Sequence, residues 1–505
     1  MKRSALTLAL LAAAVTSLPA MAQSAKDFEE LRNEVLRLRQ ELNAMKAQQA
    51  APTPAAPVAA AAPAATPAVT TAAVADPALT ERLEVLELKQ KDAVVAGDIP
   101  GSFRLPGSET SIKLYGYAEL NAVREFSGDN SDNDYSTFVP YAPINGATQR
   151  KGQTLIHART SRLGIESATP TAYGTLGVKV EGDFNNEPRL GNAAAGKSTQ
   201  SVLSQQALNS YNFRLRQAYG TLGGFLIGQT WSTFMDVDNS PETVDFNGPI
   251  GSTFIRQGLI RYTYTEPGLG SLTAALENPV SYVYDRGGYI QKSGHSKLPD
   301  IVVRFDRAFE WGALSVRGVT QEVGINRDAG KDSNYTDVNG DPIQVGSLSL
   351  KKRGYGFGTT ALYKLRGGQD SLSLGLTYGN GIGRYFNYIE GAFLDEANNR
   401  LLLEKAVGVV AGYQHKHSDT LRANFVYGWQ QNINNSYSTF ALANDLGSGQ
   451  YGINKRLYQA HAGLIYTPVK NVDLGAEYIF GQRTTLKGEK GDLSRLNLMA
   501  RYTFN

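Results

Sequence analysis

The sequence predicts an all-β membrane protein, namely a 16-stranded antiparallel transmembrane β-barrel preceded by a short coiled-coil stalk. Three observations predict it. From about residue 110 the apolar and polar residues alternate with period two, short turns and long polar connections alternate strictly, and the last strand carries aromatic residues on its apolar face. Together these features are typical of outer-membrane barrels, which have an even number of strands, short turns at one rim and long loops at the other.

The chain of 505 residues opens with a segment that resembles a secretory signal peptide, residues 1–22. Lys2 and Arg3 precede an apolar run over residues 5–15, and Ala20-Met21-Ala22 offers a small-x-small cleavage site. The alternative is an uncleaved anchor, but the run is far shorter than the roughly 20 residues of a spanning helix. No later apolar run approaches that length, so membrane insertion through helices is not expected.

Residues 23–49 are predicted to form a coiled coil, because apolar residues recur at alternating steps of three and four. The expected g positions are all acidic and the e positions all basic, which suits a parallel bundle. The alternative is one amphipathic helix packed on its own domain. The expected core residues are Phe28, Leu31, Val35, Leu38, Leu42 and Met45.

A stiff tether follows the stalk. Residues 50–78 are almost wholly Ala, Pro, Thr and Val, with proline too frequent for a helix and few bulky side chains for a core. Residues 79–99 resume a short heptad pattern with Leu79, Leu83 and Leu86, which predicts a second short helical or coiled-coil segment. Residues 100–505 are then the barrel domain, and the stalk lies outside it.

The strands of this domain have two unlike faces. In "SIKLYGYAELN", residues 111–121, Leu114 and Leu120 share one face while Glu119 and Asn121 share the other. The second face is too charged for the buried core of a soluble β-sandwich or propeller, the alternatives to a barrel. At sixteen strands a barrel encloses a water-filled lumen, so the apolar face is expected to meet lipid and the charged face to line a pore.

The connections give the strand number. Seven short turns and eight long loops make fifteen connections, hence sixteen strands. The short turns are expected at 169–174, 222–224, 266–270, 307–312, 365–370, 416–419 and 467–471, and the long loops at 122–152, 185–210, 232–253, 279–299, 323–352, 379–404, 430–455 and 483–493.

Two stretches resemble one family of proteins, and a third resembles a signal that is general to outer-membrane proteins. Residues 100–117, "PGSFRLPGSETSIKLYGY", are similar to the entry segment of DcaP-like trimeric outer-membrane porins, where the stalk enters the first strand. Residues 228–262, "GQTWSTFMDVDNSPETVDFNGPIGSTFIRQGLIRY", are similar to the fifth strand, constriction loop and sixth strand of the same family. "RLNLMARYTFN" resembles the C-terminal insertion signal of outer-membrane proteins, although Asn505 follows the terminal aromatic Phe504. The family resemblance implies a homotrimer with a periplasmic coiled coil that takes up small anions, typically dicarboxylates.

The third long loop is expected to fold into the lumen and set the narrow point. Acidic residues on it and basic residues on the facing strands would form an anion-preferring diffusion pore, saturable for mono- or dicarboxylates. The expected acidic residues of the constriction loop are Asp236, Asp238, Glu242 and Asp245, and the expected basic residues of the pore lining are Lys113, Lys179, Arg214, Arg216, Arg304, Arg317, Arg422 and Arg501. For any single arginine the alternative is that it only solvates a polar wall and plays no part in anion selection.

Two local patterns stay open. Arg159 and Arg162 are three residues apart, so an unbroken strand cannot aim both into the lumen without a bulge. Gly354, Gly356 and Gly358 share one face of a strand, which suits either a close backbone approach or an intersubunit contact.

Other function classes have little support. The charge of +3 does not indicate a nucleic-acid binder, and the absence of cysteine excludes disulfides and thiolate chemistry. "GNAAAGKS", residues 191–198, fits a nucleotide-binding pattern but lies in the second long loop, without the strand and helix that the pattern requires. Five histidines form no convincing catalytic or metal set, although His415 and His417 lie close together. No catalytic residue, metal or cofactor is therefore expected.

The remaining rivals are an outer-membrane adhesin or structural stalk protein and, with less support, an outer-membrane enzyme. The expected location is the outer membrane of a Gram-negative bacterium. Expected partners are two further copies of the chain, outer-membrane lipid and lipopolysaccharide, small anionic solutes, and peptidoglycan or another periplasmic component through the stalk.

Overall fold

The computed structural model describes residues 95–128, 139–144, 152–185, 213–336, 340–386, 391–449 and 452–504, together with Arg37 and Gln40. The signal peptide, the coiled-coil core, the linker and "GNAAAGKS" lie outside the described residues. The chain divides into a small unit, residues 1–113 with 167–170, and a large unit, residues 114–166 with 171–505.

The described part of the small unit is a short antiparallel sheet. Strand β1 (Val95–Ala96) pairs with β2 (Phe103–Arg104), which pairs with the first residues of β3 (Ser111–Ser127). Asp98 holds the sheet together, because it receives hydrogen bonds from Arg104 at 2.7 Å and from Ser111 Oγ at 3.2 Å. Val95 and Ala96 are extended, so the helical segment predicted over 79–99 does not reach its predicted end.

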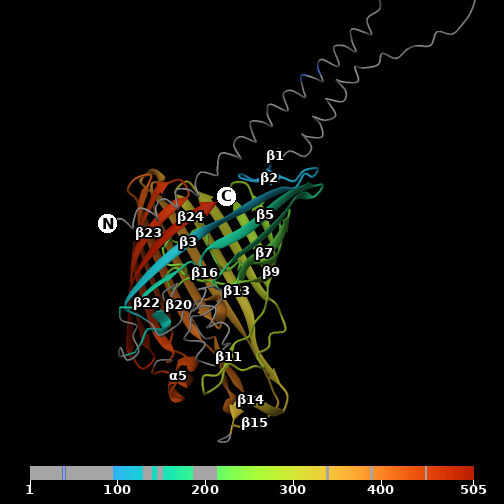
Figure 1. Ribbon diagram of the computed structural model, residues 1–505. Coiled ribbons are helices and arrows are strands. Elements are labelled where there is room, and N and C mark those ends of the chain that lie inside the picture. The colour runs from blue at the N-terminus through green and yellow to red at the C-terminus, as the bar shows by residue number, and fades with distance from the viewer. Residues whose placement is uncertain are drawn as a thin grey trace, which may run out of the picture. The chain divides into compact units, whose positions relative to one another are not determined.

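The large unit is a closed antiparallel barrel of sixteen strands, as predicted (Figure 1). Each strand pairs with the next along the chain, and the last pairs with the first through register partners such as Leu498 and Ala122. The barrel strands after β3 are β5 (Arg162–Thr171), β6 (Gly174–Asp183), β7 (Arg214–Leu222), β8 (Phe225–Trp231), β9 (Arg256–Glu266), β10 (Gly270–Glu277), β12 (Asp300–Phe309), β13 (Gly312–Arg327), β16 (Leu348–Leu365), β17 (Asp370–Asn380), β20 (Lys405–Lys416), β21 (Leu421–Asn432), β22 (Asn454–Val469), β23 (Val472–Thr485) and β24 (Lys490–Phe504).

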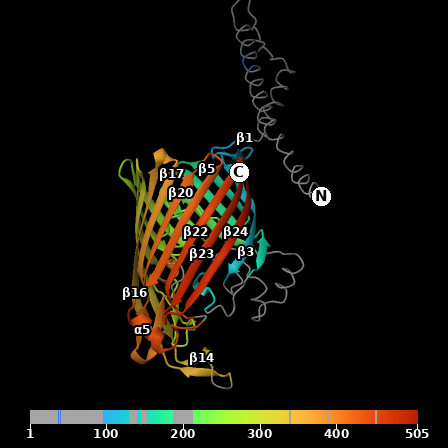
Figure 2. The same ribbon diagram turned by 90° about the vertical axis from the view of Figure 1, so that its left-hand side faces the viewer.

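All seven short turns fall where the sequence predicts them, and they share one rim of the barrel (Figure 2). The long connections share the other rim, which we call the long-loop rim, and several of them carry structure of their own. The additional elements are η1 (Val139–Tyr141), β4 (Thr154–His157), β11 (Val283–Tyr284), β14 (Gly330–Thr336), β15 (Pro342–Val345), η3 (Arg366–Gly368, in a short turn), η4 (Gly383–Tyr385), β18 (Ala392–Asp395), η5 (Glu396–Asn398), β19 (Arg400–Leu403) and α5 (Ser436–Ala443).

Several long loops are shorter than predicted. Strand β13 runs to Arg327 and β16 starts at Leu348, although a loop was predicted over 323–352. The loop predicted over 483–493 is reduced to residues 486–489. Spanning the hydrocarbon takes only about 9–11 residues of a tilted strand, so these strands extend beyond the hydrocarbon. Outside it a paired strand can carry polar residues on both faces, so a polar stretch does not show that the strand has ended.

The two faces of the strands divide as the alternation predicts. Leu114 and Phe425 are 52% and 53% exposed on the outer face, whereas Glu119 and Glu181 are 4% and 6% exposed on the inner face. The lumen is also partly filled by apolar side chains from inward-folded loops, a group that includes Phe234, Ile382, Tyr385 and Phe386. Among the described residues, no helix is both long and apolar enough to cross a membrane.

The glycines of β16 serve close packing on the inner face of the barrel. A Cβ on Gly354 would lie 2.1 Å from the carbonyl oxygen of Gly381, and one on Gly356 would lie 3.0 Å from Ile382. The outward neighbours Tyr355 and Phe357 are exposed. Of the two explanations left open by the sequence, close approach within the chain therefore applies.

The division of faces leads to a stability test. Ile260 is 50% exposed on the outer face of β9, and Thr263 faces inward on the same strand. We expect Ile260→Lys to lower the free energy of unfolding from lipid vesicles by about 2–4 kcal/mol, because it places a charge against hydrocarbon. Thr263→Lys is the matched control and should cost much less. Equal losses in denaturant titrations of the two variants would contradict the assigned faces.

Candidate functional site

Residues 232–255, which join β8 to β9, fold into the lumen and form the constriction loop. Glu277 at the end of β10 fixes the start of this loop, because its carboxylate accepts hydrogen bonds from Ser232 Oγ and from the Thr233 backbone N–H, both at 2.7 Å. Glu277 is 1% exposed. A buried carboxylate that accepts charge-assisted hydrogen bonds holds the backbone more firmly than neutral acceptors would.

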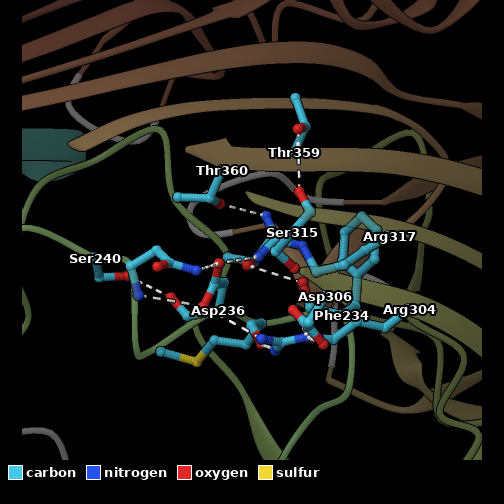
Figure 3. A network of polar contacts seen from close by, with 12 residues as sticks. Phe234, Asp236, Ser240, Arg304, Asp306, Ser315, Arg317, Thr359 and Thr360 are labelled. Atoms are coloured by element: carbon cyan, nitrogen blue, oxygen red, sulfur yellow. Dashed lines mark hydrogen bonds and ion pairs between the residues drawn. The ribbon is translucent and has the colours of Figure 1, made fainter. Parts of the chain in front are cut away.

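Asp236 attaches the next part of the loop to the wall (Figure 3). Its carboxylate lies 3.3 Å from Arg304 on β12 and 3.3 Å from Arg317 on β13. It also receives a 2.8 Å hydrogen bond from the Asn239 side chain, and Arg304 donates to the Met235 carbonyl at 2.7 Å. The charge of Asp236 is therefore opposed directly by two wall arginines.

Glu242 makes the second attachment. Arg422 on β21 donates to both of its carboxylate oxygens at 2.8 Å, and Gln414 and Asn424 donate at 2.9 and 3.0 Å. Burial alone would raise the pKa of Glu242, but the hydrogen bonds and charge of Arg422 outweigh burial and hold the pKa below its ordinary value of 4.5. The bidentate pair is the strongest geometry available to these two groups.

In a further attachment the wall again supplies the acid, as Glu277 does at the start of the loop. Glu477 on β23 accepts hydrogen bonds from the backbone N–H groups of Val244 and Asp245 at 3.0 and 2.9 Å, and His461 lies 3.2 Å away. Both Glu477 and His461 are buried. The tip of the loop is therefore bound through its backbone, and the Val244 side chain also packs against Ile465 and Met499 of the wall.

Gly251 lets the returning part of the loop lie flat on the wall. Its φ is +86°, and a Cβ would lie 2.6 Å from the carbonyl oxygen of Trp429 and 2.8 Å from that of Val409. The neighbouring Ile250 N–H donates to Gln459 at 3.1 Å. A residue with a side chain at position 251 would push the loop off the barrel wall.

A second segment, residues 381–386, also folds inward, which the sequence analysis did not predict. Gln321 of β13 donates to the Gly381 carbonyl at 2.6 Å, and the Tyr385 hydroxyl lies 2.9 Å from Asp300. Tyr385 packs edge-on against Phe234 with ring centroids 6.0 Å apart. This segment therefore supports the root of the constriction loop from the long-loop rim.

The constriction loop lines two cavities, with volumes of about 370 and 980 Å³. We call the smaller the loop cavity and the larger, which reaches the short turns, the vestibule cavity. Both are lined by Arg162, Arg216, Trp231, Met235 and Val237. These five residues mark the passage between the cavities, which we call the eyelet.

The eyelet arginines are held by acids on the neighbouring strands. Arg216 lies 2.9 Å from Glu181 and 3.0 Å from Asp183, and Arg162 lies 3.7 Å from Glu181. Arg214 also pairs with Asp183, at 2.8 Å. The acids fix the direction of the guanidinium groups and cancel part of their charge.

The remaining basic residues predicted for the lining are placed as follows. Lys179 lines the vestibule cavity and pairs with Glu166 at 2.5 Å, while Arg501 lines the loop cavity and pairs with Glu119 at 2.5 Å. Lys113 belongs to the small unit, so its place relative to the lumen stays a prediction. Seven of the eight predicted basic residues thus form ion pairs, and three of them, Arg304, Arg317 and Arg422, do so with the constriction loop itself.

The predicted acids of the loop differ in their surroundings. Asp236 and Asp245 are 4% and 2% exposed, Glu242 is half-buried, and Asp238 is exposed on the vestibule side. The sequence analysis placed these acids opposite a ring of arginine. Asp236 and Glu242 instead contact Arg304, Arg317 and Arg422 directly, so this part of the prediction is corrected, because a loop lying on the wall brings its acids within ion-pair distance.

The sequence did not predict four basic residues of the site. The orientation of Arg162 stayed open, and Arg256, Arg261 and Arg307 were not among the predicted lining residues. Arg256 stacks on Trp231 with its guanidinium carbon 4.4 Å from the ring centroid. Arg261 and Arg307 line the vestibule cavity. The alternation of Ile260, Arg261 and Tyr262 could have shown that Arg261 faces the lumen, because both of its neighbours are of the kind that faces lipid.

The spacing of Arg159 and Arg162 is explained by a break in the strand. Strand β4 ends at His157, and a turn closed by a 3.1 Å hydrogen bond from Ser161 N–H to the Ala158 carbonyl precedes β5. Arg159 is buried in this turn, and Arg162 begins β5 and reaches the eyelet. An interruption, and not a bulge within one strand, therefore frees Arg162 from the register of β4.

The described residues contain no group of three or more His, Asp or Glu side chains that could hold a metal ion. His415 lies 3.2 Å from Asp370, and its ring centroid is 5.9 Å from that of His417. These histidines lie near the turn between β20 and β21.

A family model described as DcaP outer membrane protein matches residues 83–504. The crystal structure of the outer membrane channel DcaP of Acinetobacter baumannii is similar at 25% identity, with 81% of this chain and 100% of that chain covered and a TM-score of 0.62. OmpT of Vibrio cholerae in its trimer form has 15% identity, 78% and 99% coverage and a TM-score of 0.47. An anion-selective porin from Comamonas acidovorans has 14% identity, 78% and 100% coverage and a TM-score of 0.44. A search of curated proteins finds no match.

The role of Glu477 can be tested with Glu477→Gln. A neutral amide accepts weaker hydrogen bonds from Val244 and Asp245 than a carboxylate does, so we expect the loop tip to fluctuate and the current noise of single channels in planar bilayers to rise. Glu310→Gln, in an exposed turn, is the control. Noise in Glu477→Gln equal to that of Glu310→Gln would show that the loop is held without this carboxylate.

The pair of Glu242 and Arg422 predicts a response to acid. Since the pKa of Glu242 is lowered in the folded protein, the stabilisation is complete above the ordinary value of 4.5 and is lost as the pH falls through the folded pKa. We expect channel noise recorded between pH 7 and pH 3 to rise only below about pH 4.5. Glu242→Gln should already be noisier at pH 7 and should lose part of this pH dependence. An unchanged pH profile in the variant would contradict the assignment.

Proposed function

Since this chain belongs to the DcaP outer membrane protein family and is an outer-membrane channel, we propose that it lets small hydrophilic solutes diffuse passively with a preference for anions such as mono- and dicarboxylates. One observation carries the proposal. Arg162 and Arg216 line both cavities, so a solute that passes the constriction loop meets two guanidinium groups. Arginine in a narrow pore favours anions, and its planar fork matches a carboxylate.

The ion pairs of the constriction loop support the same preference. Asp236 and Glu242 direct their charges at Arg304, Arg317 and Arg422, so these acids repel a passing anion less than free carboxylates would. Arg256 adds a positive charge next to Trp231 and makes no ion pair with any described carboxylate. The balance at the narrow point is therefore positive.

The assembly belongs to the proposal as well. We propose a homotrimer whose stalk, with its core over residues 28–45, lies in the periplasm. The outer faces of the barrels would contact lipid and lipopolysaccharide, and the stalk would reach peptidoglycan or another periplasmic component. The chain acts as a channel without catalytic residues or a cofactor.

Reversal potentials of the purified protein in a potassium chloride gradient test the selectivity. We expect a reversal potential whose sign indicates that anions are more permeant than cations, with a chloride-to-potassium permeability ratio above one. Arg216→Gln should lower this ratio, because it removes one cation and leaves Glu181 and Asp183 less compensated. Arg400→Gln, at the long-loop rim, is the charge-matched control and should leave the ratio unchanged. Preferred potassium permeation in the unmodified protein would overturn the proposal, and absence of stepwise conductance would favour an adhesin or an enzyme.

A further inference from the structure

The vestibule cavity has chemistry that the eyelet does not use. It is bounded by the turn between β9 and β10, through Glu266 and Gly268, and by strand ends next to the β12–β13 turn, through Ala308 and Ala313. Six basic side chains line it against four acidic ones, Glu181, Asp238, Glu266 and Asp306. The basic ones are Arg162, Lys179, Arg216, Arg261, Arg304 and Arg307.

Most of these basic groups are already compensated. Lys179 pairs with Glu166, and Arg304 pairs with Asp306 at 2.7 Å and with Asp236 at 3.3 Å. Arg261 and Arg307 differ, since neither makes an ion pair with any carboxylate in the described part of the chain, and the Arg307 guanidinium lies over the Phe309 ring. The charge of Arg261 is therefore available to a solute.

The strand register explains why Arg261 stands open to the cavity. Arg261 of β9 lies opposite Ala275 of β10, which lies opposite Val302 of β12. The next inward positions along these strands are Thr263, Thr273 and Arg304. Since Ala275 is small and Val302 apolar, neither offers the Arg261 guanidinium an acceptor.

Hydroxyl groups lie beside it. Thr263 and Thr273 are hydrogen-bonded at 2.9 Å, and Thr265 and Ser271 are hydrogen-bonded at 2.8 Å on the next rung. Each pair of hydroxyls has one proton that is not used between the two oxygens. A guanidinium with hydroxyl donors nearby can bind an anion by charge and by hydrogen bonds together.

We propose that the vestibule cavity is a second binding station for small carboxylates, distinct from the eyelet, in which Arg261 supplies a charge that no ion pair among the described residues neutralises. The station captures solutes from the side of the short turns and lies in series with the eyelet. Two weak stations in series allow a solute to bind and still leave, which conduction requires. This inference rests on the proposed anion preference of the channel.

The test is one-sided block of chloride current by succinate in planar bilayers. Because the chain has no cysteine, Glu310→Cys places a single thiol in the short turn between β12 and β13. A membrane-impermeant thiol reagent then shows which side of the bilayer the short turns face. The quantity measured is the succinate concentration that halves the chloride current from each side.

From the short-turn side, we expect Arg261→Gln to raise the half-blocking concentration about tenfold, the effect of losing one charge-assisted hydrogen bond. From the long-loop side the shift should be smaller, because succinate meets the eyelet first. Arg261→Lys keeps the charge without the fork and should give an intermediate value. Arg366→Gln, in the exposed turn between β16 and β17, removes a positive charge from the same rim and is the matched control.

Heat-dependent mobility in gel electrophoresis shows whether each variant is folded. If Arg261→Gln does not insert into the bilayer, Arg261→Lys still tests the proposal. A raised half-blocking concentration in Arg261→Lys supports the second station, and an unchanged one contradicts it. Equal shifts from both sides, or the same shift in Arg366→Gln, would overturn the second station. A wild-type channel that prefers cations would instead overturn the proposed function, so the two failures are distinguishable.

Discussion

The structure depends on one constraint, the need to satisfy every backbone hydrogen bond within the hydrocarbon layer. A closed sheet does this, and closure is made by β24 pairing with β3, up to Phe504 opposite Gly116. Gly116 lies where a Cβ would be 2.8 Å from the Phe504 ring. Once the sheet is closed, its inner face cannot reach lipid, and polar residues can collect there.

Closure also creates the need for the constriction loop. A sixteen-stranded barrel is too wide for its own side chains to fill, so its selectivity must come from chain that folds back inside. Here the loop is attached by charges of both signs: Asp236 and Glu242 from the loop, and Glu277 and Glu477 from the wall. These attachments engage many of the charged side chains in the lumen. A solute that enters the lumen therefore meets mainly the few cationic side chains that form no ion pair among the described residues.

The sequence predicted the barrel well because its pattern is local. Alternation and turn residues repeat in every hairpin, so sixteen strands and seven short turns could be counted without knowing any long-range contact. The site was harder, since its contacts join residues far apart in the chain, such as Glu242 with Arg422 and Val244 with Glu477. The sequence showed which charges existed but not which were paired, and for that reason Arg261 went unnoticed beside arginines that proved to be compensated. The inward fold of residues 381–386 had only an indirect sequence signal. The glycines of β16 suited a close backbone approach, but nothing in the sequence said which segment approaches them.

The direct pairing of the loop acids with wall arginines makes the constriction loop an internal counterion. Deleting the loop would widen the lumen, but it would also take the carboxylates of Asp236 and Glu242 away from Arg304, Arg317 and Arg422. The carboxylates of Glu277 and Glu477 would lose the loop N–H groups that they bind. Grafting the loop onto another barrel would place Asp236 and Glu242 against a wall that lacks arginines to pair with their carboxylates. The acids of the loop and the arginines of the wall therefore depend on one another. To exchange pore specificity between such channels, both must be transferred together.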